Sequence, residues 1–226
     1  MNEIFVFYAP EADFLLPYIE REVGKNPGPL AVMISSTEIY APHSDEILDE
    51  SADKLPGSKW EALENNFLEL HPDGIILRAA PIVGTGMAGT MRRLAEEIYS
   101  GRFMHFPDND ARKSVVHAAG IAKAVACLAE AVSLDADERV FNITDNEDPT
   151  LHDLAEALAF RMDNKRISNI STRPQQMLAK MLYGKRYRYY TTTERFSCNR
   201  LIKVLGYTPV SVCNYLRTHV YDKDSL

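Results

Sequence analysis

The stretch that most constrains the fold is a short apolar run followed by two serines. Leu30 to Ile34 reads Leu-Ala-Val-Met-Ile and lies between Pro29 and the pair Ser35–Ser36. Such a run is typical of a strand that is buried on both faces of a parallel sheet. Ligands of these sheets bind at the carboxyl ends of the strands. The sequence therefore predicts an α/β fold in which Ser36 stands at a ligand-binding edge.

Other short apolar runs predict the remaining strands and the helices between them. Strands are expected at Glu3–Ala9, Ile75–Leu77 and Val140–Ile143. Apolar residues at helical spacing predict helices over residues 12–23, 59–70, 90–100, 121–132 and 151–162. Ser58 is suited to cap the helix at 59–70, with Glu61 completing a capping box, and Thr150 is suited to cap the helix at 151–162.

Length and charge limit the classes of protein to which the chain can belong. With 226 residues, 46% of them hydrophobic, it can bury a core over residues 1–145 and add a small lobe over residues 146–226, partly interleaved with that core. A net charge of −7 argues against nucleic-acid binding. Residues 161–203 hold 11 Lys/Arg and 2 Asp/Glu, so they carry +9 against −16 elsewhere. This basic segment is either a solvated face or a surface for phosphates or an acidic partner.

The cysteines and the apolar runs indicate where the protein is located. Cys127, Cys198 and Cys213 have neither metal-ligand nor redox spacing, and an odd number of cysteines suits a reducing compartment. No basic signal region begins the chain, and no apolar run has the length of a membrane span. We therefore expect a cytoplasmic protein without a metal site or a membrane partner.

The order of the motifs resembles that of the extended short-chain dehydrogenase/reductases, the NAD-dependent sugar-nucleotide epimerases and dehydratases. In that family a Ser-Ser-x-x-Val-Tyr strand end precedes a Tyr-x-x-x-Lys helix, and here Ser35–Tyr40 precedes a helix with Lys59 in its first turn. Leu77–Gly84 resembles the family's Leu-Arg-Pro-x-x-Val-Tyr-Gly segment. Later matches follow in family order, at Arg112–His117, Val140–Ile143, Phe196–Leu201 and Leu205–Pro209.

The resemblance implies a partial Rossmann-like fold, the second half of a doubly wound sheet, with NAD or NADP as cofactor and a sugar nucleotide as a possible ligand. It assigns catalytic positions to Ser36, Glu38 and Lys59. The implied cofactor contacts are Ser35, Lys59, Arg78, Ala80 and Pro81, and the implied substrate contacts are Gly84, Arg112, Lys113 and His117.

Two departures from the family pattern affect the expected function. Leu55 stands where the family has its catalytic tyrosine, four positions before Lys59, and leucine cannot transfer a proton. Aligned by its motifs, the chain starts at the family's fourth strand, so we expect an N-terminally truncated relative. The first hypothesis is a catalytically degenerate ligand-binding or interaction module. The alternative is an active enzyme completed by another chain, with Glu38, Tyr40 or His43 as the base.

A glycine pattern offers a competing interpretation of the middle of the chain. Gly84–Gly89 matches G-x-G-x-x-G, and Asp108 lies about 20 residues further on, as in a dinucleotide-binding fingerprint. The pattern does not follow its strand directly, and Phe103–Phe106 is short for the next strand. We therefore favour the family's substrate segment for these residues.

The first strand also predicts how the protein assembles. In the family, the counterpart of Glu3–Ala9 is a central strand. At the edge of a sheet, without proline or lysine, it would expose unpaired N–H and C=O groups. We therefore expect a homodimer, or a partner chain, that covers this edge.

Overall fold

A parallel four-stranded sheet lies at the centre of the computed structural model, which describes residues 4–8, 30–43, 45–84, 87–105, 111–131, 138–161, 167–169, 177–178, 180–181, 184 and 187–218. Its strands are β1 (Ile4–Tyr8), β2 (Leu30–Ser36), β4 (Ile75–Ala79) and β8 (Val140–Ile143), in the order β1-β2-β4-β8. Ser36 lies opposite Ala79, and Ala79 lies opposite Ile143, so the carboxyl ends of three strands are level. The predicted α/β fold with a mostly parallel sheet is confirmed.

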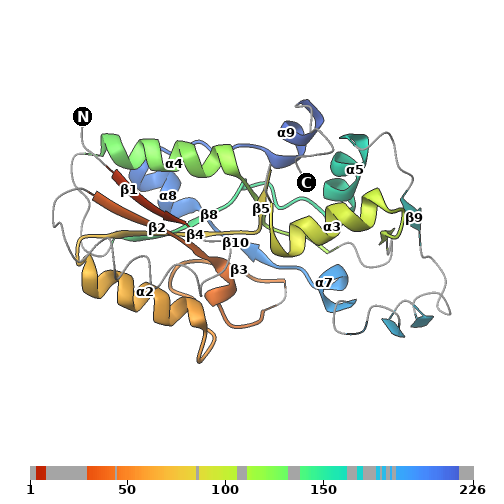
Figure 1. Ribbon diagram of the computed structural model, residues 1–226, viewed down its shortest axis with the longest axis horizontal. Helices are drawn as coiled ribbons and strands as arrows, with labels where there is room; N and C mark the ends of the chain where they lie inside the picture. The colour runs from red at the N-terminus through yellow and green to blue at the C-terminus, as the bar shows by residue number, and fades with distance from the viewer. Residues whose placement is uncertain are drawn as a thin grey trace.

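Helices cover both faces of this sheet (Figure 1). On one face, Ala31 and Met33 of β2 pack with Trp60, Leu63 and Phe67 of α2 (Lys59–Leu70). The alternate residues Val32 and Ile34 face α4 (Ala118–Glu130) and α8 (Asn199–Leu205) on the other side. Side chains alternate along a strand, so the unbroken apolar run of β2 results from burial on both faces.

A third hydrophobic cluster lies beyond the carboxyl ends of the strands. It joins α3 (Gly89–Tyr99), α5 (Leu151–Arg161) and α9 (Val212–Thr218), with Tyr190 of α7 (Tyr187–Thr191) packed against them. This cluster draws residues from both sides of position 145, and α8 returns to pack against β8. The division into a core over 1–145 and a lobe over 146–226 stays a prediction.

Three pairs of very short strands hold distant segments together. They pair β3 (Ile47–Leu48) with β10 (Arg195–Phe196), β5 (Ile82–Val83) with β7 (Val116–His117), and β6 (Met104–His105) with β9 (Ser168–Asn169). The strand expected near 103–106 therefore pairs outside the main sheet. A dinucleotide fingerprint at Gly84–Gly89 would need that strand inside it.

Capping residues explain where the helices begin. The Ser58 hydroxyl accepts from the N–H of Trp60 at 3.3 Å, whereas the Glu61 carboxylate lies 3.5 Å from Lys54 and does not form the expected capping box. Thr150 and Asp153 do form a reciprocal box at the start of α5. Nδ1 of His117 accepts from the N–H of Ala119, so α4 begins three residues earlier than predicted.

Other boundaries differ from the predictions by a few residues. β4 continues two residues past Leu77, α3 begins at Gly89, and α5 ends at Arg161. The helix predicted over 12–23 lies outside the described residues. Within the described part of the chain, no helix is both long and apolar enough to cross a bilayer.

Candidate functional site

A cavity of about 110 Å³ opens at the carboxyl ends of β2 and β4. It is enclosed by the end of β2 and the short helical turn after it, the start of α2, the end of β4 with the turn that leads into β5, and the start of α3. Its lining residues are Ile34, Ser35, Ser36, Glu38, Trp60, Ala79, Ala80, Pro81, Ile82, Ala88, Gly89 and Thr90. The structure thus brings together Ser35, Ser36, Glu38, Ala80 and Pro81, which the sequence predicted at a ligand site.

Ser36 is held in place by the turn that it starts. The last residue of β2 has extended backbone, and its Oγ accepts from the N–H of Glu38 at 3.1 Å. This bond caps the short 3₁₀ helix η2 (Thr37–Ile39), a usual role for serine at a helix start. The Ser36 hydroxyl proton remains available to a ligand oxygen in the cavity, because the cap uses only the oxygen as an acceptor.

Trp60 is the site residue that the sequence analysis missed. Its indole Nε1–H donates to Oε2 of Glu38 at 3.3 Å, while only 7% of the residue is exposed. This contact joins the first turn of α2 to η2 across one side of the cavity. A signal was present in the sequence, since Trp60 is the only tryptophan of the chain and directly follows Lys59. Indole combines an apolar face with a single donor, which suits a ring-shaped polar ligand.

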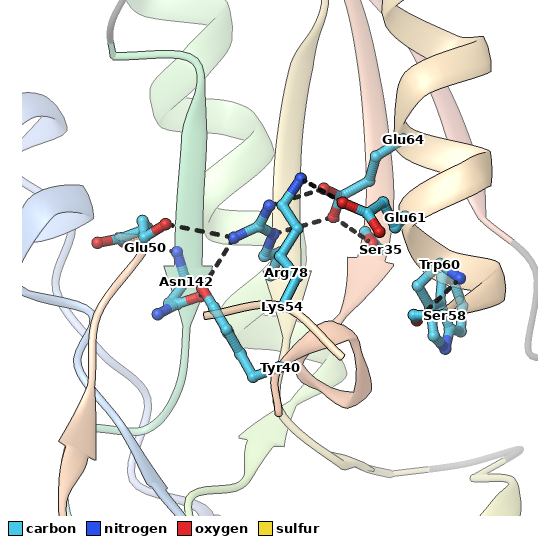
Figure 2. Close-up of polar contacts among 10 residues, drawn as sticks. All are labelled: Ser35, Tyr40, Glu50, Lys54, Ser58, Trp60, Glu61, Glu64, Arg78 and Asn142. Atoms are coloured by element: carbon cyan, nitrogen blue, oxygen red, sulfur yellow. Dashed lines mark hydrogen bonds and ion pairs between the residues drawn. The ribbon is translucent and has the colours of Figure 1, made fainter. Parts of the chain in front are cut away.

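Beside the cavity, Arg78 and Glu64 form a buried ion pair (Figure 2). Arg78 of β4 donates from Nε and Nη2 to the two carboxylate oxygens of Glu64 on α2, at 2.9 and 2.7 Å. Both side chains are 3% exposed. The hydroxyl of Ser35 donates to the same carboxylate at 2.7 Å, so this pair fixes the residue next to Ser36. Burial lowers the pKa of Arg78, but Glu64 outweighs burial and raises it overall.

The same network continues from Arg78 to β8. Nη1 of Arg78 donates to the hydroxyl of Tyr40 at 3.0 Å, and that hydroxyl donates to Oδ1 of Asn142 at 2.6 Å. The backbone N–H of Asn142 donates in turn to Glu50 at 2.8 Å. Figure 2 shows these side chains directed toward one another between the sheet and the loop after β2. Arg78, predicted at the cofactor, therefore has its guanidinium engaged inside the fold and does not line the cavity.

The three residues considered as substitutes for the missing tyrosine have different surroundings. Burial raises the pKa of Tyr40, whose hydroxyl is held between Arg78 and Asn142. The His43 ring packs edge-on against the Phe196 ring, with 5.2 Å between the two ring centres, and is not part of the cavity lining. Of these three residues, only Glu38 lies at the cavity beside Ser36.

Leu55 and Lys59, the two positions of the family's catalytic pair, lie outside the cavity lining. The Leu55 N–H donates to the Ile39 carbonyl at 2.7 Å, so its backbone runs beside η2, but 39% of the residue is exposed. Lys59 is the exposed first residue of α2. Trp60, the residue after Lys59, lines the cavity.

None of the four predicted substrate contacts lines the cavity. Lys113 is buried and its Nζ lies 2.9 Å from Glu194 and 4.5 Å from the Tyr189 ring centre. Arg112 donates to the Asp148 carbonyl at 3.1 Å. His117 caps α4, and the buried Gly84 has φ 144°, a conformation that favours glycine. Their predicted role in binding a substrate is not tested by this arrangement.

The glycine pattern differs from a dinucleotide fingerprint in its surroundings. Gly89 begins α3 with φ 60°, and a Cβ there would meet no atom within 4 Å. The third glycine of a fingerprint is needed for close helix–strand packing, which this position does not have. β5, before the pattern, pairs with β7 outside the main sheet. Residues 85–86 and Asp108 lie outside the described residues.

Comparisons with known proteins identify the fold. No known family model matches the sequence, and no curated protein matches it. Among solved structures, a conserved protein of unknown function from Silicibacter pomeroyi is similar, with a TM-score of 0.69 and 16% sequence identity. The match covers 97% of this chain and 78% of that protein. The human epimerase family protein SDR39U1, solved with NADPH, has a TM-score of 0.63 and 14% sequence identity, and the match covers 91% of this chain and 73% of that protein.

A third solved structure shows how much of such a protein this chain spans. The UDP-glucuronic acid 4-epimerase of Bacillus cereus, solved with NAD, has a TM-score of 0.63 at 15% identity and is matched over 92% of this chain. The match covers 64% of that enzyme, so the chain spans about two thirds of its length. The protein described here has the α/β fold of the NAD-dependent epimerases and related short-chain dehydrogenase/reductases.

Proposed function

We propose that the protein binds a small ring-shaped ligand in the cavity at the ends of β2 and β4, and that it does so without hydride-transfer chemistry. The observation that carries the proposal is the cavity wall itself. Ser36, Glu38 and Trp60 meet there, while the residue at the tyrosine position is Leu55, outside the lining. The wall offers a hydroxyl, a carboxylate and an aromatic face, which can bind a polar ring. It lacks the phenol that the family uses to move a proton.

The ligand class follows from the fold and from the size of the cavity. Similar structures were solved with NADPH, with NAD, and with UDP-glucose in the case of a Thermotoga maritima epimerase. Ser35, Ser36, Ala80 and Pro81 would hold a nicotinamide or sugar ring at this position. A cavity of about 110 Å³ is small beside the roughly 300–1,000 Å³ of pockets that bury a whole drug-sized ligand. The residues thus fit one ring and not an entire dinucleotide.

Fluorescence and calorimetric titrations test this proposal. Because Trp60 is the only tryptophan and lines the cavity, ligand binding should change the intrinsic fluorescence of the unmodified protein. We expect UDP-sugars or nicotinamide nucleotides to change this signal, with NAD(P) binding no tighter than about 1 mM, an affinity worth about 4 kcal/mol. Ser36→Ala should weaken binding, whereas Ser51→Ala, a serine outside the cavity lining, should not. A fluorescence and heat response unaffected by Ser36→Ala would contradict the assignment of the site.

Glu38 supports a second candidate function, an active epimerase or reductase in which this carboxylate replaces the tyrosine. It lies at the cavity beside Ser36, where a proton acceptor would be needed. NAD or NADP would supply hydride transfer, and a second chain would supply the rest of the cofactor site. Turnover of a UDP-sugar that is lost in Glu38→Gln would favour this function. On the first proposal, even Leu55→Tyr remains inactive, because general-base catalysis of about 10²–10⁴-fold requires a positioned cofactor.

A second chain is also our proposal for the edge of the sheet. Among the described strands, β1 pairs with β2 alone, and Val6 is 46% exposed. An open edge pairs readily with another strand, so we infer a homodimer or a complex with a partner chain. Light scattering should report a dimer for the unmodified protein and a smaller mass for Val6→Lys; a monomer in both cases would contradict self-pairing.

The free cysteines Cys127, Cys198 and Cys213 support a cytoplasmic location.

A further inference from the structure

The segment between α5 and α7 is strongly basic. Residues 164–193 contain no Asp or Glu, and their seven basic residues are Lys165, Arg166, Arg173, Lys180, Lys185, Arg186 and Arg188. The chain as a whole has a net charge of −7. Positive charge that is gathered in one segment of an acidic protein favours attraction to an anionic partner.

The described residues of this segment also expose large apolar side chains. Met177, Leu178 and Met181 have exposed fractions of 75%, 52% and 75%. These three residues and Lys180 are helical, and positions i, i+1 and i+4 lie on one face of a helix. Figure 1 places this short helical stretch beyond α7, at the outer edge of the molecule and away from the sheet. We call these four residues the Met177–Met181 surface.

The body of the protein anchors the chain just after this surface. Tyr190 of α7 is 4% exposed, and its hydroxyl donates to the carboxylate of Glu97 on α3. Tyr187 packs, partly buried, against the cluster formed by α3, α5 and α9. The chain thus joins the body of the protein at α7, six residues after Met181.

We propose that the Met177–Met181 surface binds the surface of an anionic phospholipid bilayer. The two methionines and the leucine would enter the boundary between headgroups and acyl chains. Lys180 would remain at the phosphates, and the positive net charge of the segment would add to its attraction to anionic lipids. A single-stranded nucleic acid would need aromatic side chains for stacking, whereas the exposed side chains here are aliphatic. The sequence expectation of no membrane partner rested on the lack of a spanning run, which does not bear on peripheral binding.

Vesicle sedimentation with the unmodified 226-residue chain tests this proposal. We expect binding to vesicles with about 30% phosphatidylserine, and none to vesicles of phosphatidylcholine alone. The double replacement Met177→Glu and Met181→Glu should reduce binding about tenfold or more, because it removes apolar contact and adds two negative charges. The matched control is the pair Leu70→Glu and Ile47→Glu, which adds the same two negative charges at residues that are 40% and 54% exposed on α2 and β3 and should leave binding unchanged. Circular dichroism verifies that each variant is folded.

Two results would overturn the proposal. One is the absence of binding to anionic vesicles at low salt. The other is binding that about 0.5 M salt abolishes but that the conservative pair Met177→Ser and Met181→Ser leaves unchanged. This second result would show a purely electrostatic contact, as expected for an acidic protein partner, with no insertion of the apolar side chains. Retained binding in Met177→Leu with Met181→Leu, together with loss in the serine pair, supports insertion.

Discussion

Replacing Arg78 by methionine should destabilise the protein far more than an ordinary loss of an ion pair. Arg78 and Glu64 are both 3% exposed and meet through two hydrogen bonds of 2.7 and 2.9 Å. Arg78→Met leaves the Glu64 carboxylate buried with only the Ser35 hydroxyl as a donor in this network. Removing one partner of a buried pair costs about 3–5 kcal/mol, because the other charge is left uncompensated.

The cost of Arg78→Met can be compared with the cost of removing an exposed ion pair in the same protein. Arg92 and Glu96 form an ion pair of similar length, 3.0 Å, but their side chains are 58% and 51% exposed. Arg92→Met should cost no more than about 0.5 kcal/mol, since exposed pairs on a helix contribute little. For a chain of this size, about 2–4 °C of melting temperature corresponds to 1 kcal/mol. Arg78→Met should thus lower the melting temperature by about 6–20 °C, and Arg92→Met by about 2 °C at most.

A double-mutant cycle separates the buried charge from the packing of the arginine. Glu64→Gln combined with Arg78→Met removes both charges, so the pair of changes should cost at least about 1 kcal/mol less than the sum of the two single changes. Urea unfolding followed by the fluorescence of Trp60, which packs on the same face of the sheet, measures all four proteins. A cost below about 1 kcal/mol for Arg78→Met, or strict additivity in the cycle, would refute the reasoning.

Three further predictions concern other parts of the fold. Burial raises the pKa of Asp145 from 3.8 to about 7, so the folded state favours the neutral carboxyl group. This group therefore contributes up to about 4 kcal/mol to the free energy of unfolding below pH 4, and that contribution is lost as the pH rises from 4 through 7. Asp145→Asn should therefore stabilise the protein at pH 8 and not at pH 4, as measured by urea unfolding at both. Gly74→Ala should cost about 1–3 kcal/mol in thermal unfolding, because its Cβ would lie 2.6 Å from the buried Phe67 ring. Gly101→Asn should cost less, because a Cβ there meets no atom within 4 Å and asparagine tolerates the φ of 68°. Glu38→Gln should alter the fluorescence maximum of the ligand-free protein, since Trp60 donates to that carboxylate at 3.3 Å; an unchanged spectrum would argue against the contact in solution.

The sequence predicted the parts of the structure that hydrophobic periodicity controls. The run Leu30–Ile34 became the doubly buried strand β2, and Ser36 stands at its end because the Glu38 N–H bonds to its hydroxyl. Ser58 and Thr150 start their helices as expected, since a side-chain oxygen at that position satisfies a free backbone N–H. Five of the predicted contact residues line one cavity because they occupy two neighbouring strand ends.

Other features could not be predicted because they depend on contacts between distant residues. Two-residue strands such as β3 and β10, about 150 positions apart, leave no periodic pattern. Glu64 on an amphipathic helix has the sequence signature of a solvated residue, and only the fold places it against Arg78. Trp60 was noticeable as the only tryptophan, but only the fold shows that its indole N–H reaches Glu38.

The buried network supports our proposal that the cavity binds a ligand without the family's chemistry. Tyr40 is the phenol closest in sequence to Ser36, but its hydroxyl accepts from Arg78 and donates to Asn142, so it stabilises the sheet and cannot reach a ligand. At the position of the missing tyrosine, Leu55 contributes only its backbone to η2. Two of the polar residues at the cavity, Ser36 and Glu38, are each bonded to a neighbour that shapes its wall. Of the residues considered as substitutes for the missing tyrosine, only Glu38 lies at the cavity, and one of its two carboxylate oxygens already accepts from Trp60. This arrangement supports our proposal of ligand binding, and turnover that is lost in Glu38→Gln would contradict it.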